Sequence, residues 1–447
     1  MPEKAARVQP ALPGLTAPSR SRTIALSAFT PGKTCMLFPH ATPCSILRST
    51  LRPILRPPRL AAMLGLLSLS LLPACGVTGT TEEVPPVAPA TEGLADATGP
   101  GAPTGMRMVT LVDGLDEPWG MDFLPDGSLL VTEQGGALKL VDGKNYTVTP
   151  VTGVPSSERA GQGGLLDVLV HPQFADNGWV YLSYTVTDGS GKYSTRVSRA
   201  RLEGGALQGV EEIFTAKPFY RERRHFGSRL LLADGYLYIT IGDRGNREQA
   251  QSLATHNGKV MRLLEDGSIP PDNPFVGTQG ARPEIWTYGH RNPQGMAQHP
   301  TNGSIWVTEH GPQGGDELNV LRPGANYGWP LVTYGEEYGG GTIGEGTHLE
   351  GTQQPLVYWV PSIGTGNIAF YTGNLYPGWQ PSLLVSGLKL TRISRLELEG
   401  DKVGSETRLL ANLGMRIRDV QIGPDGKVYA LAGGARLIRL DLGPQGG

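Results

Sequence analysis

A turn followed by an apolar strand recurs six times in this chain and limits the folds it can adopt. The copies are DGSLLVT (126–132), NGWVYLS (177–183), DGYLYIT (234–240), NGSIWVT (302–308), PSLLVS (381–386) and DGKVYAL (425–431). They begin about 45 to 80 residues apart, which fits one four-stranded sheet per repeat. The sequence therefore predicts an all-β fold, a six-bladed β-propeller of four-stranded antiparallel sheets. A β-sandwich is the structural alternative, but it does not predict a recurring phrase.

The composition agrees with many short strands joined by tight turns. The chain of 447 residues holds 63 glycines and 37 prolines, and only 18% of its residues are charged, so long helical stripes are not expected. The formal net charge is -2, and no basic block follows the first sixty residues. Neither nucleic acid nor an anionic membrane surface is therefore expected as a partner of the folded body.

The N-terminal residues 1–75 read as a leader and a lipoprotein-type signal segment. Arginines at 48, 52, 56 and 59 precede an apolar run, 60–72, that is too short to span a bilayer. The run ends in LPACG (72–76), which resembles the lipobox of bacterial lipoproteins, in which the cysteine, here Cys75, is lipidated. An ordinary secretory signal with an incidental cysteine is the alternative. We expect an exported protein, a periplasmic or cell-envelope lipoprotein, whose only membrane contact is a lipid anchor at Cys75.

The remaining chain divides into a tether and a domain. Residues 76–105 are rich in Pro, Ala and Thr and have little to bury, which predicts a flexible tether. Residues 106–447 then form the propeller domain. All three cysteines, at 35, 44 and 75, precede this domain, so it has no disulfide and no cysteine metal site.

One predicted hairpin carries an acid–base pair at its open end. Strands at 229–232 and 236–241 flank an Ala-Asp-Gly turn, with His225 just before the first strand and Asp243 just after the second. A carboxylate that holds one imidazole N–H leaves the other ring nitrogen free to accept a proton. The hairpin alone is more simply interpreted as two solvated loop residues.

Other polar residues stand at repeat ends, where propeller loops form sites. The turn GQGG (161–164) lets backbone approach a ligand and presents the Gln162 amide. Arg291 offers a planar fork for a carboxylate, and Asn292 lies beside it. The alternative for Arg291 is a turn in which it pairs with a surface acid.

Three further cations stand at corresponding places in the last repeats. Lys389 follows a strand, and Arg416 and Arg418 are two residues apart, so a strand would point both to one side. Exposed strand residues are the alternative. If these cations and Arg291 converge on one channel mouth, they predict a small polyanionic ligand.

The loop that follows the fourth copy offers backbone carbonyls. Its sequence, EHGPQGGDEL (309–318), contains a Gly-Pro pair at Gly311 and Pro312 that can turn successive carbonyls to one side, as hard cations such as Ca²⁺ require. The loop lacks the acidic spacing of a calcium-binding loop, so it does not establish a metal site by itself.

Together these residues resemble the soluble quinoprotein sugar dehydrogenases, the glucose/sorbosone dehydrogenase family, and within it the aldose sugar dehydrogenase branch. The resemblance covers most of residues 106–442. It rests on EPWGM (117–121), GQGG (161–164), HFGSR (225–229), IGD (241–243), GHRNPQG (289–295), EHGP (309–312), NYGWP (326–330) and RIRD (416–419).

The resemblance implies a six-bladed propeller that binds pyrroloquinoline quinone (PQQ) and Ca²⁺ and oxidises aldose sugars at C1 to the lactone, with electrons passed to an external acceptor. His225 would take the hydroxyl proton, Asp243 would orient His225, and Arg291 would lie beside the reacting carbonyls. The cofactor-binding residues would be Gln162, Arg291, Asn292, Ser362, Lys389, Arg416 and Arg418. The Ca²⁺ ligands would be the backbone carbonyls of Gly311 and Pro312.

The sequence departs from the family pattern near the base. Arg224 stands where glucose-preferring members have an acidic residue, which favours a broader range of aldoses, and Ser228 stands where glycine is usual. The insertions of dimeric relatives are not evident, so a monomer is expected. Two other functions fit the fold: a Ca²⁺-dependent lactonase or related hydrolase, which needs several acidic ligands, and a non-catalytic ligand-binding propeller.

Overall fold

The computed structural model describes residues 95–96 and 105–443. The predicted leader and signal segment, with Cys75, lies outside the described residues, as does most of the predicted tether. The described chain is almost entirely β, as predicted, and its two short helices are α1 (Phe174–Asn177) and η1 (Arg247–Gln251). Within these residues no helix has both the length and the apolar character needed to cross a membrane.

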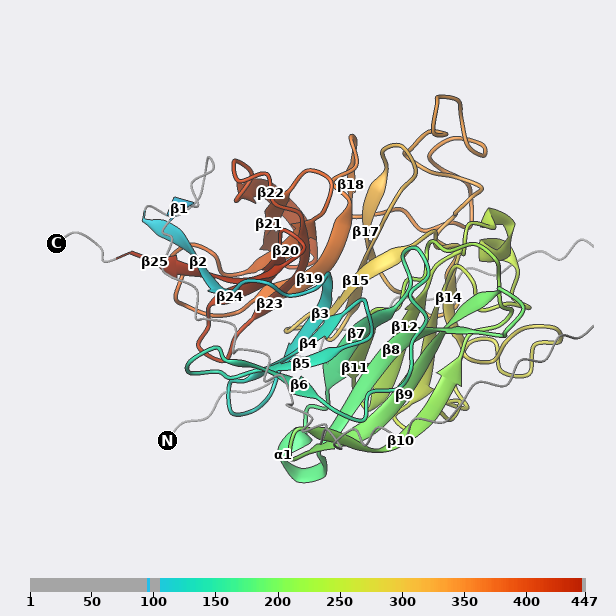
Figure 1. The fold of residues 1–447 in the computed structure, drawn as a ribbon. Coiled ribbons are helices and arrows are strands. Elements are labelled where there is room, and N and C mark those ends of the chain that lie inside the picture. Colours follow the sequence, from blue (N-terminus) through green and yellow to red (C-terminus); the bar gives the residue numbers. More distant parts are fainter. Residues whose placement is uncertain (1–94, 97–104, 444–447) are drawn as a thin grey trace, which may run out of the picture. The chain divides into compact units, whose positions relative to one another are not determined.

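Six antiparallel sheets form a six-bladed β-propeller, which confirms the predicted fold (Figure 1). Blade 1 contains β3 (Pro118–Phe123), β4 (Leu129–Glu133), β5 (Leu138–Val141) and β6 (Val148–Val151). Blade 2 contains β7 (Leu165–Val170), β8 (Trp179–Thr187), β9 (Tyr193–Glu203) and β10 (Ala206–Thr215). Blade 3 contains β11 (Leu230–Ala233), β12 (Tyr236–Ile241), β13 (Lys259–Leu264) and β14 (Ile285–Tyr288). Blade 4 contains β15 (Pro293–Gln298), β16 (Ile305–Glu309), β17 (Asp316–Val320) and β18 (Val357–Trp359). Blade 5 contains β19 (Thr365–Tyr371), β20 (Ser382–Gly387), β21 (Arg392–Glu399) and β22 (Lys402–Leu409).

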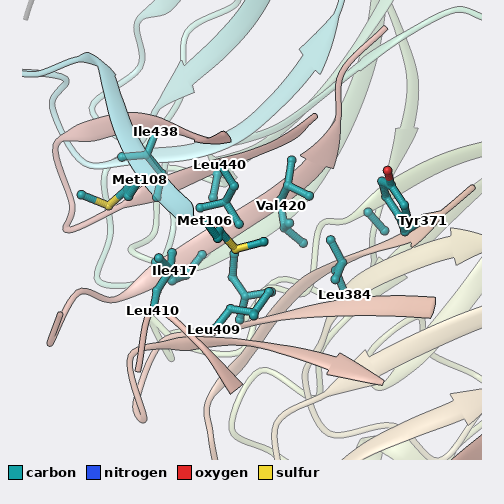
Figure 2. Packing of buried hydrophobic residues seen from close by; sticks show 14 of the residues in the cluster. Met106, Met108, Tyr371, Leu384, Leu409, Leu410, Ile417, Val420, Ile438 and Leu440 are labelled. Carbon is teal, nitrogen blue, oxygen red and sulfur yellow. The ribbon is translucent and has the colours of Figure 1, made fainter. Parts of the chain in front are cut away.

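The sixth blade joins the two ends of the domain. Its strands β23 (Ile417–Ile422), β24 (Val428–Ala432) and β25 (Arg436–Leu442) are completed by β2 (Met106–Val112), and β1 (Ala95–Asp96) adds to the edge. In Figure 1 the cyan β2 lies beside the red β25. Met106 and Met108 of β2 pack into the apolar cluster shared by blades 5 and 6 (Figure 2). This pairing joins the N-terminal and C-terminal parts of the domain in one blade and so closes the ring.

The recurring phrase is the second strand of every blade: β4, β8, β12, β16, β20 and β24. These strands are buried along nearly their whole length, because neighbouring blades cover both of their faces. This explains why the phrase reads as a continuous apolar run rather than as an alternating pattern.

The first strands of the blades surround the centre, and their polar side chains tie one blade to the next. Each of three buried or half-buried aspartates accepts a backbone N–H from the inner strand of the following blade. The bonds are Met121 N–H to Asp419 (3.0 Å), Val170 N–H to Asp122 (2.7 Å) and Leu230 N–H to Asp167 (2.8 Å). Burial, opposed in part by these bonds, raises the pKa of Asp122 and of Asp167 to about 7.

Arg229 fills the centre between these aspartates. Its guanidinium contacts Asp167 at 2.6 Å and Asp419 at 3.4 Å, and it lies 4.5 Å from the ring centre of Trp119. Trp119 lines a cavity of about 290 Å³, and Arg229 lines a second one of about 390 Å³. The Arg229–Trp119 contact therefore joins a residue of the larger cavity to a residue of the smaller one, and several of the predicted site residues line the smaller cavity.

Candidate functional site

The cavity of about 290 Å³ is lined by residues from blades that are far apart in the sequence. Four of the predicted cofactor-binding residues line it: Gln162, Asn292, Arg416 and Arg418. It is also lined by residues to which the sequence assigned no role, including Trp119, Phe226, Gln294 and His310. The lining therefore combines arginines and amide side chains with two aromatic rings.

His225 and Asp243 meet as the hairpin predicted. The Nδ1 atom of His225 lies 2.7 Å from Oδ1 of Asp243, at the open end of the hairpin formed by β11 and β12. No other described group bonds the imidazole, whose Nε2 is left free. His225 and Ser228 have left-handed backbones, with φ of 55° and 83°. Gly227 between them also has positive φ, and a Cβ there would lie 2.7 Å from the carbonyl oxygen of Thr240. Such strained turns are common at functional sites because they aim a side chain that regular structure would not.

A tryptophan from blade 4 donates a hydrogen bond to the second oxygen of the Asp243 carboxylate. The indole Nε1–H of Trp329 donates to Oδ2 of Asp243 at 2.8 Å, and the backbone N–H of Gly245 donates to Oδ1 at 2.7 Å. The sequence placed Trp329 in a motif without assigning it a role. With its second oxygen occupied, Asp243 is held so that Oδ1 faces the imidazole.

Burial and hydrogen bonding set the charges of this pair. Burial lowers the pKa of His225 below its usual 6.5, and the bond to Asp243 only partly opposes this. Burial by itself would raise the pKa of Asp243, but the bond from His225, the charge of His225 and the Gly245 N–H together lower it. Near neutral pH the pair is therefore a carboxylate and a neutral imidazole, which is the form that accepts a proton.

Gln162 and Asn292 fix the loop that carries His225. The side-chain oxygen of Gln162 accepts the backbone N–H of His225 at 2.7 Å. The side-chain oxygen of Asn292 accepts the N–H of Gly227 at 3.2 Å. Both side-chain oxygens therefore bond the protein. The groups available to a ligand are Nε2 of Gln162 and Nδ2 of Asn292.

Arg291 is buried and pairs with carbonyls instead of a carboxylate. Its Nη1 donates to the carbonyl oxygens of Gly311 at 2.7 Å and His310 at 3.2 Å, and its own carbonyl accepts the N–H of Asp243 at 2.8 Å. The alternative in which Arg291 pairs with a surface acid is wrong, because the residue is 6% exposed and forms no ion pair within the described chain.

Arg416 and Arg418 share the cavity, as predicted, although not by regular alternation. A register shift between Ile417 and Asp419 places Arg418 in a bulge of β23, and Arg416 precedes the strand. Arg418 donates to the side-chain oxygen of Gln294 at 3.1 Å. Burial, followed by the charges of Arg416 and Arg229, lowers its pKa to about 10. In the described chain, neither Arg416 nor Arg418 has a carboxylate partner.

Lys389 and Ser362 lie beside the cavity and not in its lining. The backbone N–H of Lys389 bonds the carbonyl of Ile363 at 2.7 Å, and its side chain is exposed. Ser362 is 4% exposed and its hydroxyl has no partner among the described residues. Leu388, the neighbour of Lys389, does line the cavity. Lys389 and Ser362 therefore lie next to the cavity but form no part of its lining.

The carbonyl oxygen of Gly311, a predicted Ca²⁺ ligand, already accepts a hydrogen bond from Arg291. One of its lone pairs accepts Arg291, and the N–H of Gly311 donates to Asp316 at 2.9 Å. Nearby Glu317 is half-buried, and burial followed by the charge of Glu309 raises its pKa to about 8. Within the described residues no group of three or more His, Cys, Asp or Glu side chains is placed to hold a metal ion.

A second His–carboxylate pair lies directly behind Arg291. The Nδ1 of His290 is 2.9 Å from Glu309, and its Nε2 is 2.9 Å from the hydroxyl of Thr287. Glu309 also accepts the backbone N–H of Arg291 at 2.7 Å. The sequence analysis assigned no role to this pair. The only available signal was that His290 and Glu309 lie in two of the recognised motifs, GHRNPQG (289–295) and EHGP (309–312).

Comparisons with known proteins show the family to which the chain belongs. The sequence profile described as "Glucose / Sorbosone dehydrogenase" matches residues 115–439. The chain is 42% identical to the aldose sugar dehydrogenase of Escherichia coli K12 over 74% of this chain and 91% of that protein. The crystal structure of the soluble E. coli aldose sugar dehydrogenase in the apo-form is 40% identical, with a TM-score of 0.74 over 76% of this chain and 100% of that one. The PQQ-bound aldose sugar dehydrogenase of Streptomyces coelicolor is 28% identical, with a TM-score of 0.62 over 76% of this chain and 99% of that one.

Proposed function

Because this chain belongs to the glucose/sorbosone dehydrogenase family, we propose that it oxidises aldoses at C1 to the lactone, using PQQ and Ca²⁺, and passes the electrons to an external acceptor. The family and its named members make the chain a sugar dehydrogenase, an oxidoreductase. The observation that carries the finer proposal is the His225–Asp243 pair, which leaves one ring nitrogen free at the edge of a cationic cavity.

In this proposal His225 is the general base. Its Nε2 takes the proton of the C1 hydroxyl, and Asp243 holds the Nδ1–H tautomer and stabilises the imidazolium that forms. Trp329 and Gly245 keep the carboxylate in place. When bound, the quinone supplies the two-electron oxidant that accepts the C1 hydride.

The residues present suit a tricarboxylate cofactor. Arg291 and Arg418 have no carboxylate partner in the described chain, and the buried hydroxyls of Ser362 and Thr365 have no hydrogen-bond partner there. A buried charge without a counterion is unfavourable, and an anionic ligand would remove that cost. We propose that Arg291, Lys389, Arg416 and Arg418 hold its carboxylates and that Gln162, Asn292 and Ser362 add hydrogen bonds.

For calcium the chain offers backbone carbonyls. The carbonyls of Gly311 and Pro312 are oxygen ligands of the kind that Ca²⁺ accepts, and a carbonyl oxygen such as that of Gly311, which accepts one hydrogen bond from Arg291, has two lone pairs. We propose that these two carbonyls would hold the ion together with ligands from outside the protein, and that Ca²⁺ would supply Lewis-acid polarisation of the cofactor.

The proposal is tested by titrating the purified chain with PQQ and Ca²⁺ while dye reduction by several aldoses is followed. Saturable turnover that requires both additions is the expected result. Hydrolysis of lactones with Ca²⁺ alone would favour the hydrolase instead, and tight quinone binding with no turnover of any aldose would favour a binding propeller. Chelation of Ca²⁺ is expected to abolish turnover and re-addition to restore it.

We also propose that the protein is exported as a monomeric cell-envelope lipoprotein with its lipid on Cys75. The signal-like segment and the LPACG sequence support this. Mass spectrometry of the N-terminal peptide from cells should find the lipid, and Cys75→Ser should release the protein from the membrane fraction. Light scattering of the released protein should give the mass of one chain.

A further inference from the structure

The loop that leads into His225 concentrates exposed positive charge at the edge of the cavity. Residues 221–224, Arg-Glu-Arg-Arg, are all exposed, and the next residue is the buried His225. The segment carries three arginines and one glutamate. It lies directly beside the cavity, because the carbonyl of Arg223 accepts the backbone N–H of Gln162, a residue of its lining, at 2.8 Å.

The backbone of this loop is held rigidly by a buried arginine. Arg244 is 1% exposed and donates to the carbonyls of Tyr193 at 3.0 Å, Glu222 at 2.5 Å and Arg224 at 3.0 Å. Its guanidinium also stacks on Phe226, 3.6 Å from the ring centre. The positions of the exposed side chains are therefore fixed at their base, although the side chains themselves reach into solvent.

Among the exposed arginines, Arg224 is the one nearest the base. Its guanidinium lies over Gly245, the residue whose N–H bonds Asp243, and its charge contributes to lowering the pKa of His225. Among the described residues its only ion-pair partner is Glu222, at 3.6 Å, and both side chains are about half exposed. An exposed pair at that distance is weak, so Arg224 remains able to bind another anion.

Two other acids near the cavity are already paired with arginines. Glu117 contacts Arg159 at 2.5 Å, and Glu337 contacts Arg247 at 2.5 Å. With three arginines and one glutamate, residues 221–224 carry a net positive charge even before Arg291, Arg416 and Arg418 are counted. A tricarboxylate cofactor would neutralise those three, whereas the charge on the His225 loop would persist.

We propose that this enzyme prefers aldoses that carry an anionic group, a carboxylate or a phosphate, and that Arg224 binds that group while C1 faces His225. This inference rests on the proposed function. The oxidation is the one already described: the C1 hydroxyl proton goes to Nε2 and the hydride to the quinone, and the anionic group takes no part in the bond changes. Arg224 therefore determines specificity and is not a catalytic residue.

The test compares kcat/KM of the PQQ- and Ca²⁺-loaded enzyme for glucose, glucuronic acid and glucose 6-phosphate. At low salt we expect at least one anionic sugar to exceed glucose about threefold to tenfold, and the excess to shrink in 1 M NaCl, where the screening length falls to about 3 Å. The two anionic sugars distinguish a carboxylate site from a phosphate site.

The variant Arg224→Gln should lower the ratio of anionic to neutral kcat/KM by a similar factor, and Arg224→Glu should lower it further. Arg201→Gln is the matched control, because Arg201 is an exposed arginine eight residues along β9 from Tyr193 and away from the cavity. Turnover of glucose without any preference for an anionic sugar would overturn this inference and leave the proposed function standing. No turnover of any aldose would overturn both.

Discussion

Two His–carboxylate pairs lie close together in this molecule, and they differ in the second nitrogen of the ring. In both, Nδ1 faces a carboxylate, at 2.7 Å for His225–Asp243 and at 2.9 Å for His290–Glu309. His290 is fully buried, its Nε2 is bonded to Thr287, and its ring stacks on Tyr327 at 4.6 Å. His225 keeps its Nε2 free. The His290–Glu309 pair is therefore structural, whereas the His225–Asp243 pair contains a candidate base.

The two pairs are also connected. Glu309 holds the backbone N–H of Arg291, and the carbonyl of Arg291 accepts the backbone N–H of Asp243. The buried pair thus fixes Arg291, one of the residues proposed to bind the cofactor, and through its carbonyl the backbone of Asp243. The comparison predicts that changes to His225 act on turnover, whereas changes to His290 act on stability and reach turnover only through Arg291.

The largest effect is expected from His225→Gln. Removal of a general base lowers kcat by about 10² to 10⁴, since no other described group is placed to take the proton. Steady-state dye reduction measures this loss, and quinone binding and the free energy of unfolding should change little, because the ring makes one hydrogen bond within the protein. If His225→Gln retained most of the wild-type kcat, His225 would not be the base.

Asp243→Asn should have the next largest effect. The amide cannot accept both the His225 ring N–H and the indole N–H of Trp329, so one donor faces another and the imidazole loses its preferred tautomer. We expect kcat to fall by about 10 to 10³, with less change in KM. A double variant of His225 and Asp243 should be no slower than His225→Gln alone; additive losses would show that the two residues act separately.

His290→Gln should chiefly destabilise the fold. It breaks buried hydrogen bonds to Glu309 and Thr287 and the stack on Tyr327, which together correspond to about 2 to 4 kcal/mol of unfolding free energy. Urea unfolding measures the loss, and the folded fraction should keep kcat within about tenfold of wild type. A loss of kcat as large as that of His225→Gln, without destabilisation, would contradict the contrast between the pairs.

The fold could be predicted from a local pattern, and a hairpin could bring His225 and Asp243 together, although their role as a pair came from the family resemblance and not from the hairpin. The recurring phrase marks strands buried on both faces, and a hairpin necessarily joins its own ends. Trp329 could not be predicted to bond Asp243, because that contact joins residues of different blades across 86 positions of sequence. The same holds for Asp122, Asp167 and Asp419, which tie neighbouring blades and carry no local signal. The bulge at Arg418 was also missed, because a register shift leaves no mark in a short strand.

The smallest and most specific effect is expected from Trp329→Phe, which removes only the indole N–H from Asp243. Wild-type kcat/KM should be constant near neutral pH and fall on the acid side with an apparent pKa below 6.5, because the lowered pKa of His225 keeps the ring neutral to a more acidic pH. Without the indole donor, Asp243 is a stronger acceptor for the imidazolium, so the pKa of His225 rises. The acid limb should then move to higher pH by up to about one unit, with kcat reduced by less than about tenfold. Trp306→Phe is the matched control, since it deletes an indole N–H that bonds Ser304 in blade 4 and has no contact with the pair. A shift of the acid limb to lower pH, or an equal shift in the Trp306 variant, would show that Trp329 stabilises the fold without tuning the base.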